Sequence, residues 1–477
     1  MKISAPLAAL SIALATTAAA QTTKPEVLAH MNETKATYED IALKIWGYAE
    51  LGYQETKSSA LLQSQLKGEG FEVKSGLAGE PTSFIASYGS GRPIIAIIGE
   101  FDALPELSTE AWSPTRKPIP GAKAGHGCGH NLFGAGSAAA AVAAKDWMKA
   151  TGQKGTLRYY GCPAEEGGSG KVYLVRDGLF ADVDAVLHWH ASDRNLANPQ
   201  SNLANKSAKF RFHGSVVGEQ ASQPRNAIKG MEAMDIMVAL MRDQMPPDSV
   251  VQYALLHGGQ APNVPTMFAE NFYYFRNHSR LLAEEGFRAV VHAAEGAALG
   301  TGTKMDYEIM HGNYELLPND TLNRIMHANM VAVGGFKFSE EEKAFAEKLG
   351  HSLPGARTAA LELAETIQPY DPNPPVGQFS TDVGDVSWNV PTAMCMAAVT
   401  VPGVPLHSWQ AAACTGTTIG LKGMMVAAKT LALTAIDYFQ QPDLLVKAKV
   451  ELVQRRGADF KYIPMVGDRK PPLDFRN

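Results

Sequence analysis

The stretch Pro93-Ile94-Ile95-Ala96-Ile97-Ile98-Gly99 is an uninterrupted apolar run between a proline and a glycine. A short run without polar positions is typical of a strand buried on both faces, as in parallel sheets. Segments 156–161 and 183–189 are further strand candidates, and the alanine-rich segment 134–148 has helical spacing. Strands that alternate with helices predict an α/β domain with a mostly parallel sheet.

Metal-binding side chains follow each predicted strand. Asp102 comes just after the first strand, Glu165 and Glu166 follow the second, and His190 ends the third. The carboxyl ends of parallel strands lie at one edge of the sheet, where sites of open α/β proteins gather. We therefore expect these side chains to lie close together.

The segment His126-Gly-Cys-Gly-His130 is the strongest sign of a metal site. Glycines let the backbone turn sharply and approach an ion closely, so Cys128 and His130 can point at one spot. We expect His126 to support the ligands rather than to bind metal itself. His407, in the loop Gly403–Trp409, is a more distant candidate.

Two adjacent carboxylates can divide the work of a catalytic site. In extended backbone the side chains of Glu165 and Glu166 diverge, so one can bind metal while the other faces water as a general base. His188 and His190 would share one face of their strand, and the spacing does not choose between them. Asp102 could orient a ligand through a hydrogen bond.

The donor set indicates the kind of ion. Thiolate, imidazole and carboxylate together suit zinc, while carboxylates with open positions also admit manganese, cobalt or nickel. Five protein ligands are too many for one tetrahedral ion. The set therefore predicts two divalent ions, about 3.5–4 Å apart as in two-metal hydrolases.

The chain of 477 residues is too long for a single core. Segments 209–213, 231–245, 250–256, 267–275, 284–299 and 304–309 read strand, helix, strand, strand, helix, strand. They predict a small α+β domain inserted into the larger one. The expected division is a signal peptide at 1–20, a catalytic domain at 21–206 and 313–440, the inserted domain at 207–312, and a charged, proline-bearing tail at 441–477 that wraps the surface.

Composition excludes several partners. The net charge is −5 without a long basic run, which argues against nucleic acid and against a membrane-binding patch. Lys2, the apolar segment 5–15 and the small residues before Gln21 are typical of a cleaved signal peptide, so we expect a periplasmic or secreted protein with no membrane association after cleavage. Four cysteines over this length are not a disulfide framework, and whether Cys162, Cys395 and Cys414 pair is left open.

These motifs resemble those of a known family, the amidohydrolases of the aminoacylase/carboxypeptidase metallopeptidase group. The matching segments span most of the chain and are long and specific. They are Gly99–Pro105, Pro118–Gly121, Gly125–His130, Tyr160–Gly170, Ser380–Trp388 and Pro405–His407.

The resemblance implies a metallopeptidase-like catalytic domain and a set of roles. It implies metal ligands at Cys128, His130, Glu166, His190 and His407. It makes Glu165 the catalytic base, prefers His190 over His188, and places Asn263 of the inserted domain toward substrate. The inserted domain would be the lid through which members form homodimers.

The implied reaction is hydrolysis of the amide bond of N-acyl or N-aroyl amino acids, small molecules with a free carboxylate. A dipeptidase or exopeptidase of the same group is an alternative, and a catalytically silent exported binding protein is another. The silent alternative rests on one departure: the family's lid carries an Ala-His-Ala segment, but here Ser215–Ser222 contains no histidine. His213, Gln220 or His257 could compensate for the missing donor.

Overall fold

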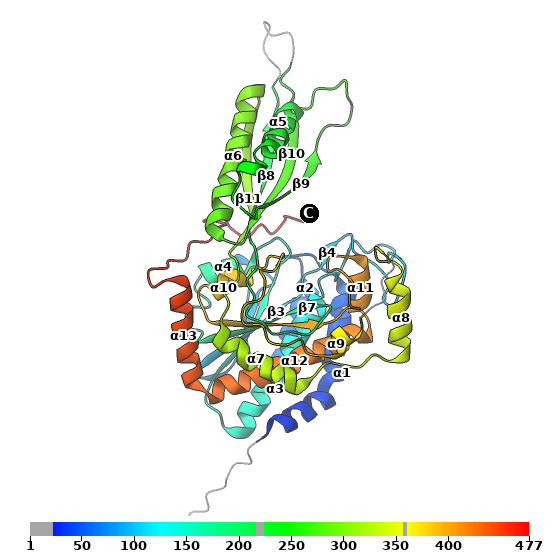
Figure 1. Ribbon diagram of the computed structural model, residues 1–477, viewed down its shortest axis with the longest axis vertical. Coiled ribbons are helices and arrows are strands. Elements are labelled where there is room, and N and C mark those ends of the chain that lie inside the picture. The colour runs from blue at the N-terminus through cyan, green and yellow to red at the C-terminus, as the bar shows by residue number, and fades with distance from the viewer. Residues whose placement is uncertain (1–21, 216–223, 356–359, 477) are drawn as a thin grey trace, which may run out of the picture.

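The computed structural model describes residues 22–215, 224–355 and 360–476. The chain folds into a large α/β unit and a smaller unit that stands above it (Figure 1). The predicted signal peptide at 1–20 lies outside the described residues.

The large unit is built on a six-stranded sheet with the order β1-β2-β6-β3-β7-β12. Strands β6, β3, β7 and β12 are parallel to one another, whereas β2 pairs antiparallel with β6 and β1 antiparallel with β2. The mostly parallel sheet predicted from sequence is confirmed. The strands are β1 (Glu72–Ser75), β2 (Phe84–Ser90), β3 (Ile94–Glu100), β6 (Gly155–Cys162), β7 (Ala185–Ser192) and β12 (Thr392–Ala398).

Apolar sequence explains the centre of this sheet. Every residue of β3 is buried, because the sheet is covered on both sides. Helices α3 (His130–Thr151) and α12 (Thr418–Gln440) pack against each other and contact the central strands. Their glycines and alanines let the helix backbones lie close to the sheet. Helices α1 (Lys24–Tyr48) and α2 (Thr56–Gly68) pack on α3 from outside.

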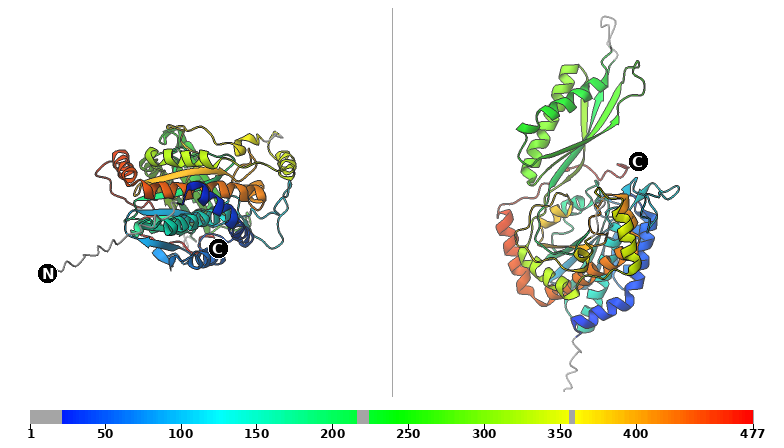
Figure 2. Two further views of the ribbon diagram at one scale, coloured as in Figure 1. Left: turned by 90° about the horizontal axis from the view of Figure 1, so that it is seen from below. Right: turned by 45° about the vertical axis from the view of Figure 1, so that its right-hand side comes forward.

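The small unit is a four-stranded antiparallel sheet, order β11-β8-β10-β9, with two helices packed on it (Figure 2). Its elements are β8 (Ala204–His213), α5 (Ala227–Leu240), η2 (Arg242–Gln244), β9 (Val250–His257), β10 (Phe268–Asn277), α6 (Arg280–Thr301) and β11 (Lys304–Asn313). This is the predicted order of strands and helices, and we call the unit the lid. The domain limits at 207 and 312 stay predictions, since β8 and β11 run on as continuous strands toward the large unit.

Shorter elements complete the large unit. They are η1 (Leu77–Gly79), β4 (Leu104–Pro105), β5 (Ala124–Gly125), α4 (Gly170–Arg176), α7 (Asp320–Val333), α8 (Glu340–Gly350), α9 (Glu362–Glu365), α10 (Val383–Ser387), α11 (Trp409–Thr415) and α13 (Pro442–Arg456). After α13 the chain runs on to Arg476 between the lid and the large unit (Figure 1). Much of this tail is exposed or half-buried, and Arg476 near its end also lines the central cavity, which the sequence did not predict.

One helix among the described residues, α12, is long and apolar enough to cross a membrane. Its apolar stretch is 89% buried inside the protein, where it packs on α3 and on the sheet. Its hydropathy is therefore explained by its place in the core. All four cysteines are buried and free, so the described structure contains no disulfide.

The contact between α12 and β12 sets a strict limit on side-chain size. A Cβ added at Gly423 would overlap the carbonyl oxygen of Ala398. We expect Gly423→Ala to push the helix from the sheet and to destabilise the protein by about 1–3 kcal/mol. A lowered midpoint of thermal unfolding would show this.

Gly47 provides the matched control, because it also lies in a helix but a Cβ added there would have no atom within 4 Å. Gly47→Ala should leave stability unchanged or raise it by up to about 1 kcal/mol, since alanine favours the helix. Equal destabilisation by both substitutions would contradict the packing argument.

Candidate metal centre and cavity

The loop before α3 brings Cys128 and His130 to one point. Gly129 has φ 80°, a left-handed conformation that glycine adopts without strain, and it caps the helix. A Cβ at Gly129 would also lie 2.9 Å from Ala191 Cβ at the end of β7. The glycine therefore lets the loop lie directly against the strand that carries His190.

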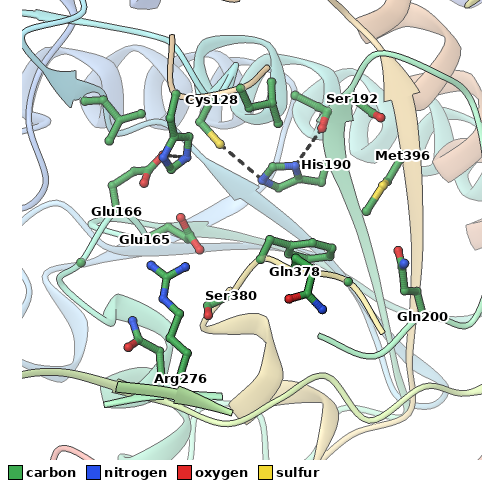
Figure 3. Close-up of a pocket in the computed structure, with 18 of the residues that line it drawn as sticks. Cys128, Glu165, Glu166, His190, Ser192, Gln200, Arg276, Gln378, Ser380 and Met396 are labelled. Carbon is green, nitrogen blue, oxygen red and sulfur yellow. Dashed lines mark hydrogen bonds and ion pairs between the residues drawn. The ribbon is translucent and has the colours of Figure 1, made fainter. Parts of the chain in front are cut away.

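Two histidines present a free ring nitrogen to this point. His190 Nδ1 donates to the carbonyl of Ala191 at 2.9 Å, which leaves Nε2 facing the Cys128 sulfur at 3.5 Å (Figure 3). His130 Nδ1 donates to Asp102 Oδ1 at 2.9 Å, and its Nε2 has no hydrogen-bond partner in the described structure although it is buried. A hydrogen bond on one ring nitrogen fixes the tautomer and frees the other to bind metal.

His407 comes from the loop between β12 and α11. Its backbone N–H donates to the carbonyl of Gly127 at 2.9 Å, and its Nε2 lies 3.2 Å from Glu166 Oε1. His407 has φ 60°, a strained conformation for a residue with a side chain. Strain of this kind persists where surrounding contacts hold a functional side chain in place.

Asp102 connects the two halves of the site. Its Oδ1 accepts from His130, and its Oδ2 accepts from the backbone N–H of Glu166 at 2.9 Å. The carboxylate is buried and uses both oxygens. It therefore orients one predicted ligand, as the sequence predicts, and also positions the backbone of another.

Glu165 lies beside these groups and lines the cavity. Its carboxylate is 4.0 Å from His130 Nε2. Burial and the neighbouring carboxylates of Glu100 and Glu166 raise its pKa well above the ordinary value. The thiol of Cys128 behaves oppositely: burial opposes ionisation, but His190, His130 and His407 outweigh it and lower the pKa to about 5.

The described side chains form three groups whose ligand atoms lie within 4.8 Å of one another. The groups are Cys128 with His130 and His190, Cys128 with Glu166 and His407, and Glu100 with His130 and Glu165. The first two share the Cys128 sulfur and together contain all five predicted ligands.

The hydrogen bonding of these residues also supports the binding of divalent ions. Buried Glu166 Oε1 and His130 Nε2 have no hydrogen-bond partner in the described structure. Buried polar atoms nearly always make hydrogen bonds, and these two lie only 3.2 Å from other groups of the site, His407 Nε2 and Glu100 Oε2 respectively. Ligand-type atoms that gather around a thiolate without hydrogen bonds fit a bound cation. The donor set of sulfur, imidazole nitrogen and carboxylate oxygen matches first-row metals.

Sequence reasoning missed a buried ion-pair network beneath the site. Lys171 Nζ lies 2.6 Å from Glu100 Oε1 and 2.6 Å from Asp382 Oδ1, and all three side chains are fully buried. Glu100 Oε2 in turn lies 3.2 Å from His130 Nε2. The position of Glu100 at the carboxyl end of β3 could have indicated a site residue. Lys171 is far from Glu100 in the sequence, and only the fold brings the two side chains together.

Other predicted residues lie farther from the centre. His126 Nε2 donates to the carbonyl of Ile45 at 3.0 Å, so this buried ring fastens the loop to α1. His188 is fully buried, 4.0 Å from Glu100, while His190 lines the cavity. Asn263 is exposed in the loop between β9 and β10 and does not line the cavity of its own chain.

The lid presents different residues from those expected to replace the missing histidine. His213 ends β8, at the opposite end from Asn205, which lines the cavity, and it pairs with Asp306. His257 is exposed, and Gln220 lies outside the described residues. Instead, Tyr274 and Arg276 of β10 and His311 of β11 line the cavity.

The cavity has a volume of about 1170 Å³ and is lined both by lid residues and by residues near the carboxyl ends of the parallel strands. Its metal-facing wall carries Cys128, Glu165 and Glu166, and Arg276 and Ser380 lie across from them (Figure 3). A space of this size holds a small organic molecule. Acidic and sulfur donors on one wall and a guanidinium on the other suit a polar, anionic substrate.

Comparison with known proteins identifies the family. Residues 96–435, most of the chain, match Peptidase family M20/M25/M40. The matched range includes every predicted metal ligand and Glu165. The chain belongs to this family, and it is a metal-dependent amidohydrolase related to peptidases.

Curated relatives extend over nearly the whole chain. It is 36% identical over 441 residues to a subunit of the p-aminobenzoyl-glutamate hydrolase of Escherichia coli (strain K12), and the match covers 87% of this chain and 91% of that protein. It is 26% identical to Xaa-Arg dipeptidase of Mus musculus, with 85% and 86% covered.

Solved structures share the fold. An aminobenzoyl-glutamate utilization protein from Klebsiella pneumoniae aligns with a TM-score of 0.60 at 16% identity, covering 87% of this chain and 99% of that one. A dinuclear metal-binding M20 peptidase from Bacillus subtilis aligns with a TM-score of 0.56 at 16% identity, covering 86% and 99%. The α/β catalytic domain with an added smaller domain is therefore the fold of this family.

The contacts of Asp102 predict the effect of Asp102→Asn. An asparagine oxygen can accept from His130 or from the Glu166 N–H, but its amide group would face the remaining donor. We expect metal affinity to fall about 10- to 100-fold, as for other outer partners of metal ligands. Calorimetric titration of metal-free protein with Zn²⁺ or Mn²⁺ measures this.

Asp182→Asn is the matched control, because Asp182 pairs with Arg158 at the surface and touches no predicted ligand. It should bind metal as the wild type does. Unchanged affinity in Asp102→Asn would show that Asp102 does not orient the ligands.

Proposed function

We propose that this protein uses two divalent metal ions to hydrolyse the amide bond of N-acyl or N-aroyl amino acids with a free carboxylate. The observation that carries the proposal is the position of Glu165, which lines the cavity beside two ligand groups that share Cys128. A protein that only bound metal would have no use for an unligated carboxylate there. The p-aminobenzoyl-glutamate hydrolase relative supports an aroyl amino acid as substrate.

Cys128, His130 and His190 would hold one ion, and Cys128, Glu166 and His407 the other. Zinc or manganese suits this donor set best, and cobalt or nickel are acceptable. Bound ions would supply Lewis acidity that lowers the pKa of water toward about 7 and polarises the scissile carbonyl.

Glu165 performs the proton transfers. As general base it takes a proton from the attacking water while the water oxygen bonds to the carbonyl carbon. It then gives that proton to the amide nitrogen as the carbon–nitrogen bond breaks, and the products are a carboxylic acid and an amino acid. Glu165 lies next to the predicted metal ligand Glu166. It is therefore close to the place where the scissile amide bond of a substrate would bind.

The lid supplies positive charge across the cavity. Arg276 extends from β10 toward Glu165 and Ser380 (Figure 3). Burial lowers the pKa of Arg276, and its Nε has no acceptor in the described structure. A guanidinium binds a carboxylate through two parallel hydrogen bonds, so Arg276 is the group for the substrate's α-carboxylate.

The direct test is Glu165→Gln. We expect bound metal to remain at the wild-type amount while kcat falls at least about 100-fold, the lower range for loss of a general base. Metal analysis and hydrolysis of benzoyl amino acids measure the two quantities. Glu110→Gln, a change of an exposed glutamate, is the control.

Near-normal turnover of Glu165→Gln would remove Glu165 from the mechanism. A chelator should abolish hydrolysis by the wild type, and added Zn²⁺ or Mn²⁺ should restore it. Dipeptides in the same substrate panel separate the amidohydrolase from a dipeptidase such as the mouse relative. Metal-loaded protein that cleaves neither class would be a binding protein.

We also propose that the lid forms a homodimer through β9. This strand is at the edge of its sheet, and Leu255 is 60% exposed on it. Exposed apolar edge strands pair with other strands unless they are blocked. In a dimer, Asn263 beside this edge would be brought near the second copy of the chain.

Leu255→Lys should shift the protein from dimer to monomer in analytical ultracentrifugation, because it places a charge on the edge. Leu299→Lys is the control, since Leu299 is exposed on α6, which contacts β11 at the other side of the sheet. A wild type that sediments as a monomer would refute the proposed dimer.

Export remains a proposal that rests on the sequence of residues 1–20 alone. The mature protein would then act in the periplasm or outside the cell. Sequencing of the N-terminus of protein from a cell envelope fraction tests this, and an uncleaved cytoplasmic chain would refute it.

A further inference from the structure

The segment 457–476, which we call the strap, runs between the lid and the large unit (Figures 1 and 2). On the lid side, Arg469 forms an ion pair with Glu308 of β11 at 2.6 Å and donates to the carbonyl of Ile309. Gly312 of β11 lies against Met465 so closely that an added Cβ would be 2.8 Å from the Met465 Cβ. The strap is therefore packed on the strand that leads out of the lid.

The strap is also fastened to the large unit. Arg176 Nη1 donates to the carbonyl of Arg469 at 2.7 Å, and Tyr462 donates to Asp385 at 2.7 Å. Near its end, the ring of Phe475 packs edge-on against Tyr53 at 5.9 Å. These contacts fix the direction in which the chain reaches Arg476.

Arg476 enters the cavity beside the metal centre. Its Nη2 donates to the backbone carbonyl of Glu166 at 2.5 Å, and its side chain lines the cavity. A guanidinium has five N–H donors, so this bond leaves most of them for a ligand. Among the described residues, no carboxylate oxygen lies within 4.0 Å of the Arg476 guanidinium, the distance that defines an ion pair.

Arg276 is a second guanidinium without an ion-pair partner among the described residues. It lies 5.3 Å from the centre of the Tyr274 ring, and both arginines influence the pKa of His311. A Cβ at Gly167 would be 3.3 Å from the Tyr274 hydroxyl and 3.6 Å from Arg476 Nη2. The two guanidinium groups therefore both lie close to Tyr274 in the same cavity.

We propose that Arg476 makes the enzyme selective for acyl derivatives of dicarboxylic amino acids, of which glutamate is the type. Arg276 binds the α-carboxylate, and Arg476 binds the carboxylate of the amino-acid side chain. This inference rests on the proposed function. Two partly buried cations without counter-ions are costly, and a doubly anionic substrate neutralises both through bidentate hydrogen bonds.

The test compares N-benzoyl-glutamate with N-benzoyl-glutamine, which has nearly the same shape but lacks the second charge. The wild type should prefer the glutamate compound by about 10- to 100-fold in kcat/KM, as a hydrogen-bonded charge pair provides. Arg476→Gln should reduce this preference to about one, mainly by raising KM for the glutamate compound. Arg476→Lys should retain part of this preference, because the positive charge remains but the two parallel N–H donors of the guanidinium are lost.

Lys470→Gln is the matched control. Lys470 lies on the same strap and carries the same charge, but it is exposed and does not line the cavity. It should keep the wild-type preference. If Arg476→Gln lowers kcat/KM equally for both substrates, Arg476 only holds the strap in place and the proposal is overturned.

Binding to metal-loaded protein separates this inference from the proposed function. Calorimetry on the wild type and Arg476→Gln gives the Kd of both benzoyl compounds without any need for turnover. If the wild type hydrolyses neither compound but still binds N-benzoyl-glutamate more tightly than N-benzoyl-glutamine, the proposed reaction is wrong and the role of Arg476 stands. If both proteins hydrolyse the two compounds without any preference for the glutamate compound, the role of Arg476 is wrong and the proposed reaction stands.

Discussion

Buried negative charge at the carboxyl ends of the parallel strands is the constraint on which this structure depends. Glu100, Asp102 and Asp382 are almost wholly buried, and Glu165 and Glu166 lie beside them. Buried carboxylates are tolerated only with compensating cations or hydrogen-bond donors. Lys171 neutralises part of this charge from below, while Asp102 is stabilised by two donors. The remaining charge faces the cavity, where metal ions and cationic lid residues complete the balance.

The fold followed from local patterns because burial on both faces leaves a plain signal in the sequence. The run 93–99 became β3, and the alternating lid strands appeared in the predicted order. Adjacent strands placed Asp102, Glu165 and His190 at one edge, as the strand-end rule requires. His407 had no local signal, and only the resemblance to a family connected it to Cys128. The contacts of the tail with β11 and the cavity could not be predicted, because they involve isolated side chains without periodicity.

The lid shows how a missing residue can be misinterpreted from sequence alone. His213 is near the absent histidine in the chain, but the ten-residue strand β8 carries it away from the cavity. Tyr274, Arg276 and His311 reach the cavity because they lie at the other end of β10 and β11. Burial lowers the pKa of His311 to about 4, with Arg276 adding to this effect, so the ring is neutral at pH 7. Position along a strand, rather than proximity in sequence, decides which lid residues meet the substrate.

The strap makes the lid and the metal centre mechanically dependent on each other. Arg469 holds β11, and only a few residues farther on Phe475 and Arg476 are anchored beside Glu166. A rotation of the lid away from the large unit would have to stretch or break these contacts. The chain thus ties β11 of the lid to the loop that carries Glu165 and Glu166 through one short segment that ends in a guanidinium group.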